Sequence, residues 1–214
     1  MQIDLIFGIV VLIVSIVLHE VSHGYMANWL GDPTARLAGR LTLNPLSHID
    51  PVGSVLLPGL LLLTHAPILI GYAKPVPYNP YNLRGRYGEG LVAFAGPGTN
   101  ILLALIFGLL IRFSGAQLGP DLVAAFSIIA YVNLLLALFN LIPVPPLDGS
   151  KVLSAVLSAL SPAVSRAYDT FRINFERLGI LSGTLLILVF FYFLAPYFSV
   201  LLFSLLSLLT GTAL

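Results

Sequence analysis

Two histidines and a glutamate lie close together within an otherwise apolar stretch near the N-terminus. His19, Glu20 and His23 form the pattern H-E-x-x-H, and the preceding segment from Leu5 to Leu18 carries no charge. Residues four apart lie on the same face of a helix, so both imidazoles can bind one metal ion. Glu20 is then placed to accept a proton from a metal-bound water. Zinc suits this chemistry because it lowers the pKa of bound water to about 7.

Chance, or a polar contact between helices, is the alternative explanation of this motif. Histidines in membrane helices do form hydrogen bonds between helices, but such a contact gives no reason for a glutamate between them. Ionisable side chains are costly in lipid and usually mark a functional site there. The pattern therefore predicts a metal site, with His19 and His23 as ligands and Glu20 as the general base.

A catalytic zinc site has three protein ligands and one open position, so a third ligand must come from elsewhere. The candidates are the other ionisable groups near apolar segments, His48, Asp50, His65 and Asp148. Asp148 fits best because it follows a long uncharged run and a proline-rich stretch that can bend the backbone toward a site. From spacing alone, Asp148 could instead cap a helix beginning near Gly149. His65, with no motif around it, is expected to be structural.

The composition is that of an integral membrane protein. Of 214 residues, 58% are hydrophobic and only 9% are charged, whereas a soluble domain carries about 25% charged residues. The formal net charge of +1 gives no reason to expect nucleic acid as a partner, and the lack of cysteine excludes disulfides and thiolate chemistry. The length suits a single membrane-embedded domain over residues 1–214.

Uncharged runs long enough to cross a bilayer predict an all-α polytopic helical bundle. Helices are expected at Leu5–Leu30, Leu91–Ile111 and Leu122–Leu147, and Leu178–Leu214 is long enough for one helix and a second piece after Pro196. Val152–Ser165 is too short to span comfortably. Prolines and glycines interrupt residues 51–73, and Lys74 to Pro80 is expected to be extended or turn. A re-entrant or extended segment is therefore predicted around residues 51–80.

Three segments together resemble the site-2 proteases, a family of intramembrane zinc metalloproteases. They are the His19–His23 motif, Ala95-Gly-Pro-Gly-Thr-Asn100, and Phe139-Asn-Leu-Ile-Pro143 followed by Pro146-Leu-Asp-Gly149. The resemblance implies Asp148 as the third zinc ligand, one zinc ion per chain, and a role for Asn140 in holding the substrate or the developing oxyanion. The segments Asn44–Gly53 and Gly71–Pro77 look like those of the compact bacterial and archaeal members without a PDZ domain.

The resemblance implies a zinc-dependent endopeptidase that cleaves peptide bonds in or near transmembrane segments of membrane-protein substrates. A membrane metal-binding or transport protein is one alternative, but it would need paired ligand sets along a path and would not need Glu20. A catalytically silent member acting as a scaffold is another, although the intact Glu20 speaks against it. The expected partners are the lipid bilayer and transmembrane substrates, and the oligomeric state stays open.

Other polar residues have both a functional and a structural explanation. Asn140 could form only an interhelical hydrogen bond, and Asn100 and Asn133 are expected to serve helix packing. His48 and Asp50 could line the mouth of the site or simply cap a turn. Lys74 to Asn79 could be a plain loop, or an extended edge that pairs with a substrate strand by β-addition.

Depth and charge predict the orientation in the membrane. Binding of one metal ion requires His19 and Asp148 to lie at the same depth in the membrane, each toward the end of its helix, so these two helices run in the same direction. The helix between them in the sequence then runs in the opposite direction. Residues 51–73 must therefore enter and leave the membrane on the side where the first helix ends. Nine of the ten Lys and Arg residues share that side and only Arg112 is opposite, whereas a full crossing would split them seven to three. The positive-inside rule favours the first arrangement and predicts a site toward the cytoplasmic side of the cell membrane.

Overall fold

The structure is a computed structural model and describes residues 2–56, 59, 63, 73–179, 183, 185–186 and 189–212. All regular elements in these ranges are helices, as the all-α prediction requires. Four helical stretches are long and apolar enough to cross a membrane: Leu5–Trp29, Gly88–Ser114, Pro120–Asn140 and Tyr192–Thr210. The chain is therefore an all-α multi-pass membrane protein.

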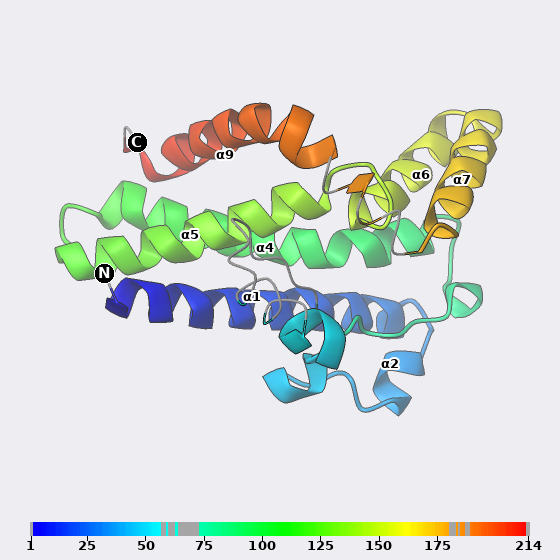
Figure 1. Cartoon of the computed structure of the whole chain (residues 1–214), viewed down its shortest axis with the longest axis horizontal. Coiled ribbons are helices and arrows are strands. Elements are labelled where there is room, and N and C mark those ends of the chain that lie inside the picture. Colours follow the sequence, from blue (N-terminus) through cyan, green and yellow to red (C-terminus); the bar gives the residue numbers. More distant parts are fainter. Residues whose placement is uncertain are drawn as a thin grey trace.

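Three long helices form the centre of the bundle and pack against one another. They are α1 (Gln2–Trp29), α4 (Gly88–Ser114) and α5 (Pro120–Asn140). α1 and α5 run in the same direction and α4 runs in the opposite direction, while α9 (Ala195–Thr210), preceded by the π-helix η4 (Phe190–Leu194), covers α4 and α5 (Figure 1). The predicted relative directions of the first three spans are thus found in the structure.

A short helical hairpin closes one end of the bundle. α6 (Asp148–Leu160) packs against α4, and α7 (Pro162–Glu176) packs back on α6. Arg172 of α7 forms an ion pair with Glu89 in the first turn of α4, with a distance of 3.1 Å between Nη1 and Oε1. The hairpin therefore holds the start of α6 next to α4.

Between α1 and α4, the described residues form short elements. These are α2 (Thr34–Leu37), η1 (Pro45–His48), η2 (Pro51–Leu56) and η3 (Pro80–Asn82). α1 ends at Trp29 and the chain turns at Gly31, whose φ of +108° is one that glycine adopts readily. The Arg84 amide donates to the Leu30 carbonyl at 2.8 Å, so the end of α1 adjoins the approach to α4. The end of α1 and the start of α4 thus lie at the same end of the bundle, as predicted. The predicted re-entrant path itself falls largely on residues 57–72, of which the structure describes two positions.

One predicted helix is shorter than expected. The run Leu122–Leu147 is helical only to Asn140, where α5 ends, and Asp148 begins α6 instead of ending a long helix. The prolines from Pro143 onward explain the early stop, because proline lacks the amide donor and restricts the residue before it. The run Val152–Ser165 is divided between α6 and α7. The piece expected after Pro196 is α9, with Pro196 in its first turn.

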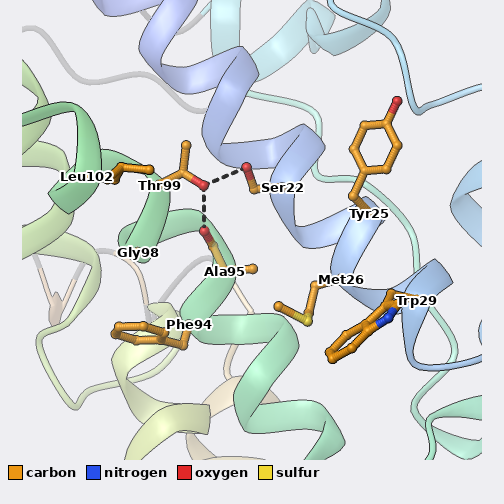
Figure 2. A pocket seen from close by; sticks show the side chains of 9 residues that line it. All are labelled: Ser22, Tyr25, Met26, Trp29, Phe94, Ala95, Gly98, Thr99 and Leu102. Carbon is orange, nitrogen blue, oxygen red and sulfur yellow. Dashed lines mark hydrogen bonds between the residues drawn. The ribbon is translucent and has the colours of Figure 1, made fainter. Parts of the chain in front are cut away.

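A groove of about 520 Å³ runs between α1 and α4 on the surface of the bundle (Figure 2). Its walls are mostly apolar and include Trp29, Phe94 and Leu102. Thr99 donates a hydrogen bond to Ser22 between the two helices, with 2.8 Å between the hydroxyl oxygens. The groove contains none of the predicted metal ligands, so the candidate chemistry lies elsewhere, in a smaller cavity.

Candidate metal centre

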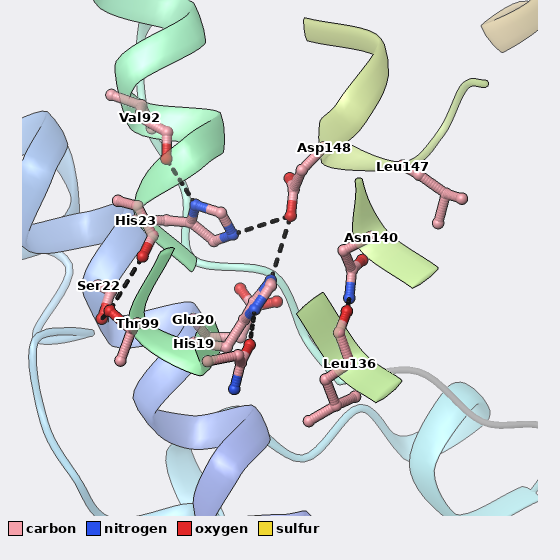
Figure 3. A network of polar contacts seen from close by, with 12 residues as sticks. His19, Glu20, Ser22, His23, Val92, Thr99, Leu136, Asn140, Leu147 and Asp148 are labelled. Carbon is pink, nitrogen blue, oxygen red and sulfur yellow. Dashed lines mark hydrogen bonds and ion pairs between the residues drawn. The ribbon is translucent and has the colours of Figure 1, made fainter. Parts of the chain in front are cut away.

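His19 and His23 project from adjacent turns of α1 toward the starts of α4 and α6 (Figure 3). Both side chains are buried, and their rings meet edge to face with 4.7 Å between centroids. The four-residue spacing of the motif therefore has the geometric effect predicted from the sequence, which is to place two imidazoles on one face of one helix.

The outer nitrogen of each imidazole has its own hydrogen-bond acceptor. His23 Nδ1 lies 2.7 Å from the Val92 carbonyl oxygen, and His19 Nδ1 lies 2.6 Å from Oδ1 of Asn100. Carbonyl oxygens can only accept, so in both rings Nδ1 carries the proton and donates. A neutral imidazole protonated at Nδ1 has its lone pair on Nε2, which is the form of histidine that binds a metal.

Asp148 completes the group from the first turn of α6. Its Oδ2 lies 3.1 Å from His19 Nε2 and 3.3 Å from His23 Nε2 (Figure 3). Ligands about 2.0–2.1 Å from a tetrahedral zinc are roughly 3.3 Å apart, so these separations fit the ion. Two imidazoles and a carboxylate are also a donor set found in catalytic zinc sites. Among the described residues, this is the one group of three or more His, Cys, Asp or Glu side chains able to hold a metal.

The capping alternative for Asp148 is wrong. The N-cap residue of α6 is Leu147, and no side chain forms a capping hydrogen bond there. Gly149 allows the start of α6 to approach the end of α5, since a Cβ on Gly149 would lie 2.3 Å from the Leu141 carbonyl oxygen. This close backbone contact places the Asp148 carboxylate against the histidines.

Gly96 brings α4 directly against the imidazoles. A Cβ at this position would lie 2.5 Å from His23 Nε2 and 2.7 Å from His19 Nε2. Glycine is therefore required for α4 to pass this close to the metal-binding nitrogens. Asn100, at the end of the A-G-P-G-T-N segment, was predicted to serve helix packing, and the contact of Gly96 shows that packing by this segment forms one wall of the candidate centre.

A buried chain of polar side chains extends from His19 into the bundle. Asn100 accepts from His19 and donates through Nδ2 to Oδ1 of Asn133 at 2.8 Å. Asn133 in turn donates to the Ser15 hydroxyl at 3.0 Å and to the Ile129 carbonyl at 2.9 Å. Both asparagines have no exposed surface. They join α1, α4 and α5, as expected for residues that serve helix packing. Asn100 also orients the predicted ligand His19, a contact that was not predicted from the sequence.

Glu20 lines a cavity of about 210 Å³ together with His19, His23 and Asp148. Its Oε2 accepts a hydrogen bond from the Val76 amide at 3.0 Å. The carboxylate is thus tied to the extended segment between residues 73 and 79. This segment forms another wall of the cavity, and Glu20 is hydrogen-bonded to it in the cavity that holds the metal ligands.

Asn140 lines the same cavity from the last residue of α5. Its Nδ2 donates to the Leu136 carbonyl of its own helix at 2.9 Å. Within the described residues it forms no hydrogen bond to another helix, so the interhelical explanation does not hold there. A substrate or oxyanion role remains a proposal.

His48 and Asp50 are not among the residues that line the cavity with the metal ligands, and both have structural contacts. His48 Nε2 is 2.9 Å from the Thr42 carbonyl, and Asp50 Oδ1 accepts from the amides of Val52 and Gly53. Both residues therefore stabilise turns, as their structural alternative predicted. His65 lies outside the described residues.

The segment from Lys74 to Asn79 is extended, as predicted, and is held at several points. Arg40 donates to the Lys74 carbonyl at 2.8 Å, and buried Asp32 accepts from the Asn79 amide at 2.7 Å. With the Glu20 contact at Val76, these bonds place the segment beside the cavity. No sequence motif indicates the anchor at Asp32, which joins residues 47 apart in the chain.

Membrane helices that bring two histidines, an aspartate and a glutamate into one cavity define a candidate intramembrane metallopeptidase. The model of the family described as Peptidase family M50 matches residues 7–186. The chain therefore belongs to this family, the site-2 protease family, and is a zinc metalloprotease, that is, a peptide hydrolase.

Curated relatives carry names that agree with this family. The chain is 37% identical over 184 residues to "Putative zinc metalloprotease YwhC" of Bacillus subtilis, covering 78% of each chain. It is 32% identical over 159 residues to "Putative zinc metalloprotease Rip2" of Mycolicibacterium smegmatis, covering 71% of this chain and 59% of that protein. "Zinc metalloprotease MJ0392" of Methanocaldococcus jannaschii is 26% identical over 150 residues, covering 70% of this chain and 34% of that protein. No solved structure matches significantly.

Proposed function

We propose that the protein is an endopeptidase that cleaves peptide bonds in or near transmembrane segments of other membrane proteins. One zinc ion per chain is held by His19, His23 and Asp148. The observation that carries the proposal is that Glu20 and these three side chains line a single cavity within the helical bundle. A transporter would need further ligand sets, and the described residues hold one such group.

Zinc, when bound, supplies Lewis-acid chemistry by lowering the pKa of a water molecule and polarising a peptide carbonyl. Glu20 accepts the proton of the attacking water and passes it to the leaving amine. The Val76 amide restrains the Glu20 carboxylate through Oε2 and leaves the other oxygen for this proton. Asn100 and Val92 keep both histidines in the tautomer that presents Nε2 to the ion.

The substrate must enter the cavity with its helix locally unwound, because the carbonyls of an intact helix are hydrogen-bonded internally. We propose that residues 74–79 pair with this unwound strand. Within the described part of the chain, the Val76 carbonyl and the Tyr78 amide form no hydrogen bond and can serve as partners. Asn140, on the opposite helix, is proposed to donate to the substrate or to the developing oxyanion.

The site is proposed to face the cytoplasmic side of the cell membrane. The helix directions put nine of the ten basic residues at the end of the bundle where α1 and α5 finish, and Arg112 at the other end. An excess of Lys and Arg is typical of cytoplasmic segments. This distribution supports an orientation in which the extended segment and α6 lie near the cytoplasm.

The test combines metal analysis with cleavage. Purified protein in detergent should cleave members of a panel of single-helix membrane substrates, and a zinc chelator should abolish cleavage until zinc is restored. The variants His19→Ala, His23→Ala and Asp148→Ala should each lose zinc and activity. Full zinc content and full activity in Asp148→Ala would exclude that ligand, and cleavage of no member of a broad panel would count against the proposed function.

A further inference from the structure

We propose that Lys151 binds an acidic side chain of the substrate close to the scissile bond, so that the enzyme prefers substrates with aspartate or glutamate at one position. This inference rests on the proposed function, since it concerns the same cavity. It goes beyond that function by naming a chemical feature of the substrate.

Lys151 projects into the cavity from the same helix as Asp148. It lies three residues later on α6, and residues three apart share a face of a helix. Lys151 lines the cavity of about 210 Å³ together with Glu20, Asn140 and the three candidate metal ligands. A side chain of a bound substrate strand would therefore meet the ammonium group within the cavity that holds the reacting peptide.

The position of the ammonium group is defined by Tyr78. Lys151 Nζ lies 5.2 Å from the centroid of the Tyr78 ring, which comes from the extended segment on another side of the cavity. A cation over an aromatic face is attracted by the ring, and this interaction favours one position of an otherwise flexible side chain. Because Tyr78 belongs to the segment proposed to pair with the substrate, the ammonium lies beside the expected path of the strand.

Asp148 and Glu89 are near enough to stabilise the Lys151 charge, but neither carboxylate lies within ion-pair distance of Lys151 in the described part of the chain. Arg172, by comparison, forms ion pairs with Glu89, Asp169 and Glu176. A half-buried cation loses hydration that a cation–π contact only partly replaces. A carboxylate of the substrate would supply a charge-assisted hydrogen bond, which is stronger than a neutral one and stronger again where water is excluded.

The positive charge of Lys151 also disfavours substrates with a lysine or arginine at this position. Segments next to membrane helices on the cytoplasmic side are rich in Lys and Arg, and such residues would be repelled by Lys151. The charge of Lys151 therefore separates substrates by the sign of one side chain, through attraction to acidic residues and repulsion of basic ones.

The experiment uses one membrane substrate that the wild-type enzyme cleaves. At each of several positions on both sides of the scissile bond, the residue is changed to Asp, Asn or Lys, and kcat and KM are measured. At one position, Asp should raise kcat/KM over Asn by roughly tenfold, mainly through KM, and Lys should lower it. Lys151→Met should remove this difference, Lys151→Arg should keep it, and Lys151→Glu should reverse it in favour of Lys.

Arg166→Met is the matched control, because it removes an exposed cation of α7 outside the cavity and should leave the preference for Asp unchanged. Zinc content of each variant reports on folding. Cleavage by the wild-type enzyme with no preference for Asp at any position overturns the inference and leaves the proposed function intact. An equal loss on all substrates in Lys151→Met, with zinc retained, also overturns it, since the lysine would then act at the reacting atoms or on the fold.

Discussion

At the scale of single residues, Gly96 gives the sharpest test of the candidate centre. In Gly96→Ala, the new methyl would lie within 2.7 Å of Nε2 of both His19 and His23, so the imidazoles or α4 must move. We expect zinc content and cleavage both to be lost. Gly8→Ala in α1 is the control, because a Cβ there meets nothing within 4 Å. Normal zinc content and activity in Gly96→Ala would mean that α4 does not pass this close to the ligands.

Asn100 is predicted to set the zinc affinity through His19. Asn100→Ala removes the acceptor of His19 Nδ1 and leaves buried Asn133 without one partner. Loss of such an outer partner typically costs about 10–100-fold in metal affinity or activity. Competition with a fluorescent zinc chelator measures the affinity. Thr99→Ala, which affects the groove between α1 and α4 instead, should bind zinc like the wild type, and an unchanged affinity in Asn100→Ala would contradict the role.

The residue-scale predictions succeeded where local spacing decides the geometry. His19 and His23 share a face because they are four apart in a helix, and this needed no tertiary information. Asp148 was selected among several ionisable residues chiefly through the family resemblance, since its approach depends on how α6 packs. The contact between His19 and Asn100 joins residues 81 apart in the chain. Only helix packing creates such a contact, so spacing alone could not predict it.

At the scale of elements, Asp32 is predicted to anchor the extended segment beside the cavity. Its carboxylate accepts from the Asn79 amide, the Asn82 side chain and the Thr34 hydroxyl. Asp32→Ala should therefore destabilise the protein by about 1–3 kcal/mol. Cleavage should also fall, because the Val76 contact to Glu20 depends on the same segment. Thermal unfolding in detergent measures the first effect.

The pH dependence of this anchor follows from the pKa of Asp32. Burial alone would raise the pKa, but the hydrogen bonds from Thr34, Asn82 and Asn79 more than offset it, and the pKa lies below the ordinary value of 3.8. The stabilisation is thus present above pH 3.8 and lost as the pH falls through the lower folded-state value. Wild type and Asp32→Ala should differ in stability at pH 7 and converge in strong acid; a difference that grows in acid would refute the assignment.

The positions of the helices could be predicted largely from the distribution of charged residues and prolines in the sequence. Uncharged runs located α1, α4 and α5 because lipid excludes charged side chains over the length of a span. The end of α5 at Asn140 was missed, although the prolines that follow it were visible. Proline shows that a helix must stop nearby, but the packing of Gly149 against the end of α5 decides where the next one starts.

At the scale of the whole molecule, the orientation can be tested with single cysteines in a chain that has none. Leu37 and Tyr81 are exposed on the segments flanking the predicted re-entrant region, and Gln117 is exposed at the opposite end of the bundle. On intact cells, a membrane-impermeant thiol reagent should label Gln117→Cys and not Leu37→Cys or Tyr81→Cys. Both should react once the membrane is opened. Labelling of Tyr81→Cys from outside, with Leu37→Cys protected, would show a full crossing between them.

Glu20 is the proposed base of a zinc-dependent peptide hydrolysis, and Glu20→Gln separates this role from metal binding. Glu20→Gln keeps the size of the side chain and an oxygen that can accept from the Val76 amide, but the amide cannot take the proton of water. Zinc content and cleavage of a membrane substrate are measured on the same purified sample. We expect full zinc content with cleavage at least about 100-fold slower than wild type. Cleavage at the wild-type rate with zinc retained would contradict the mechanism.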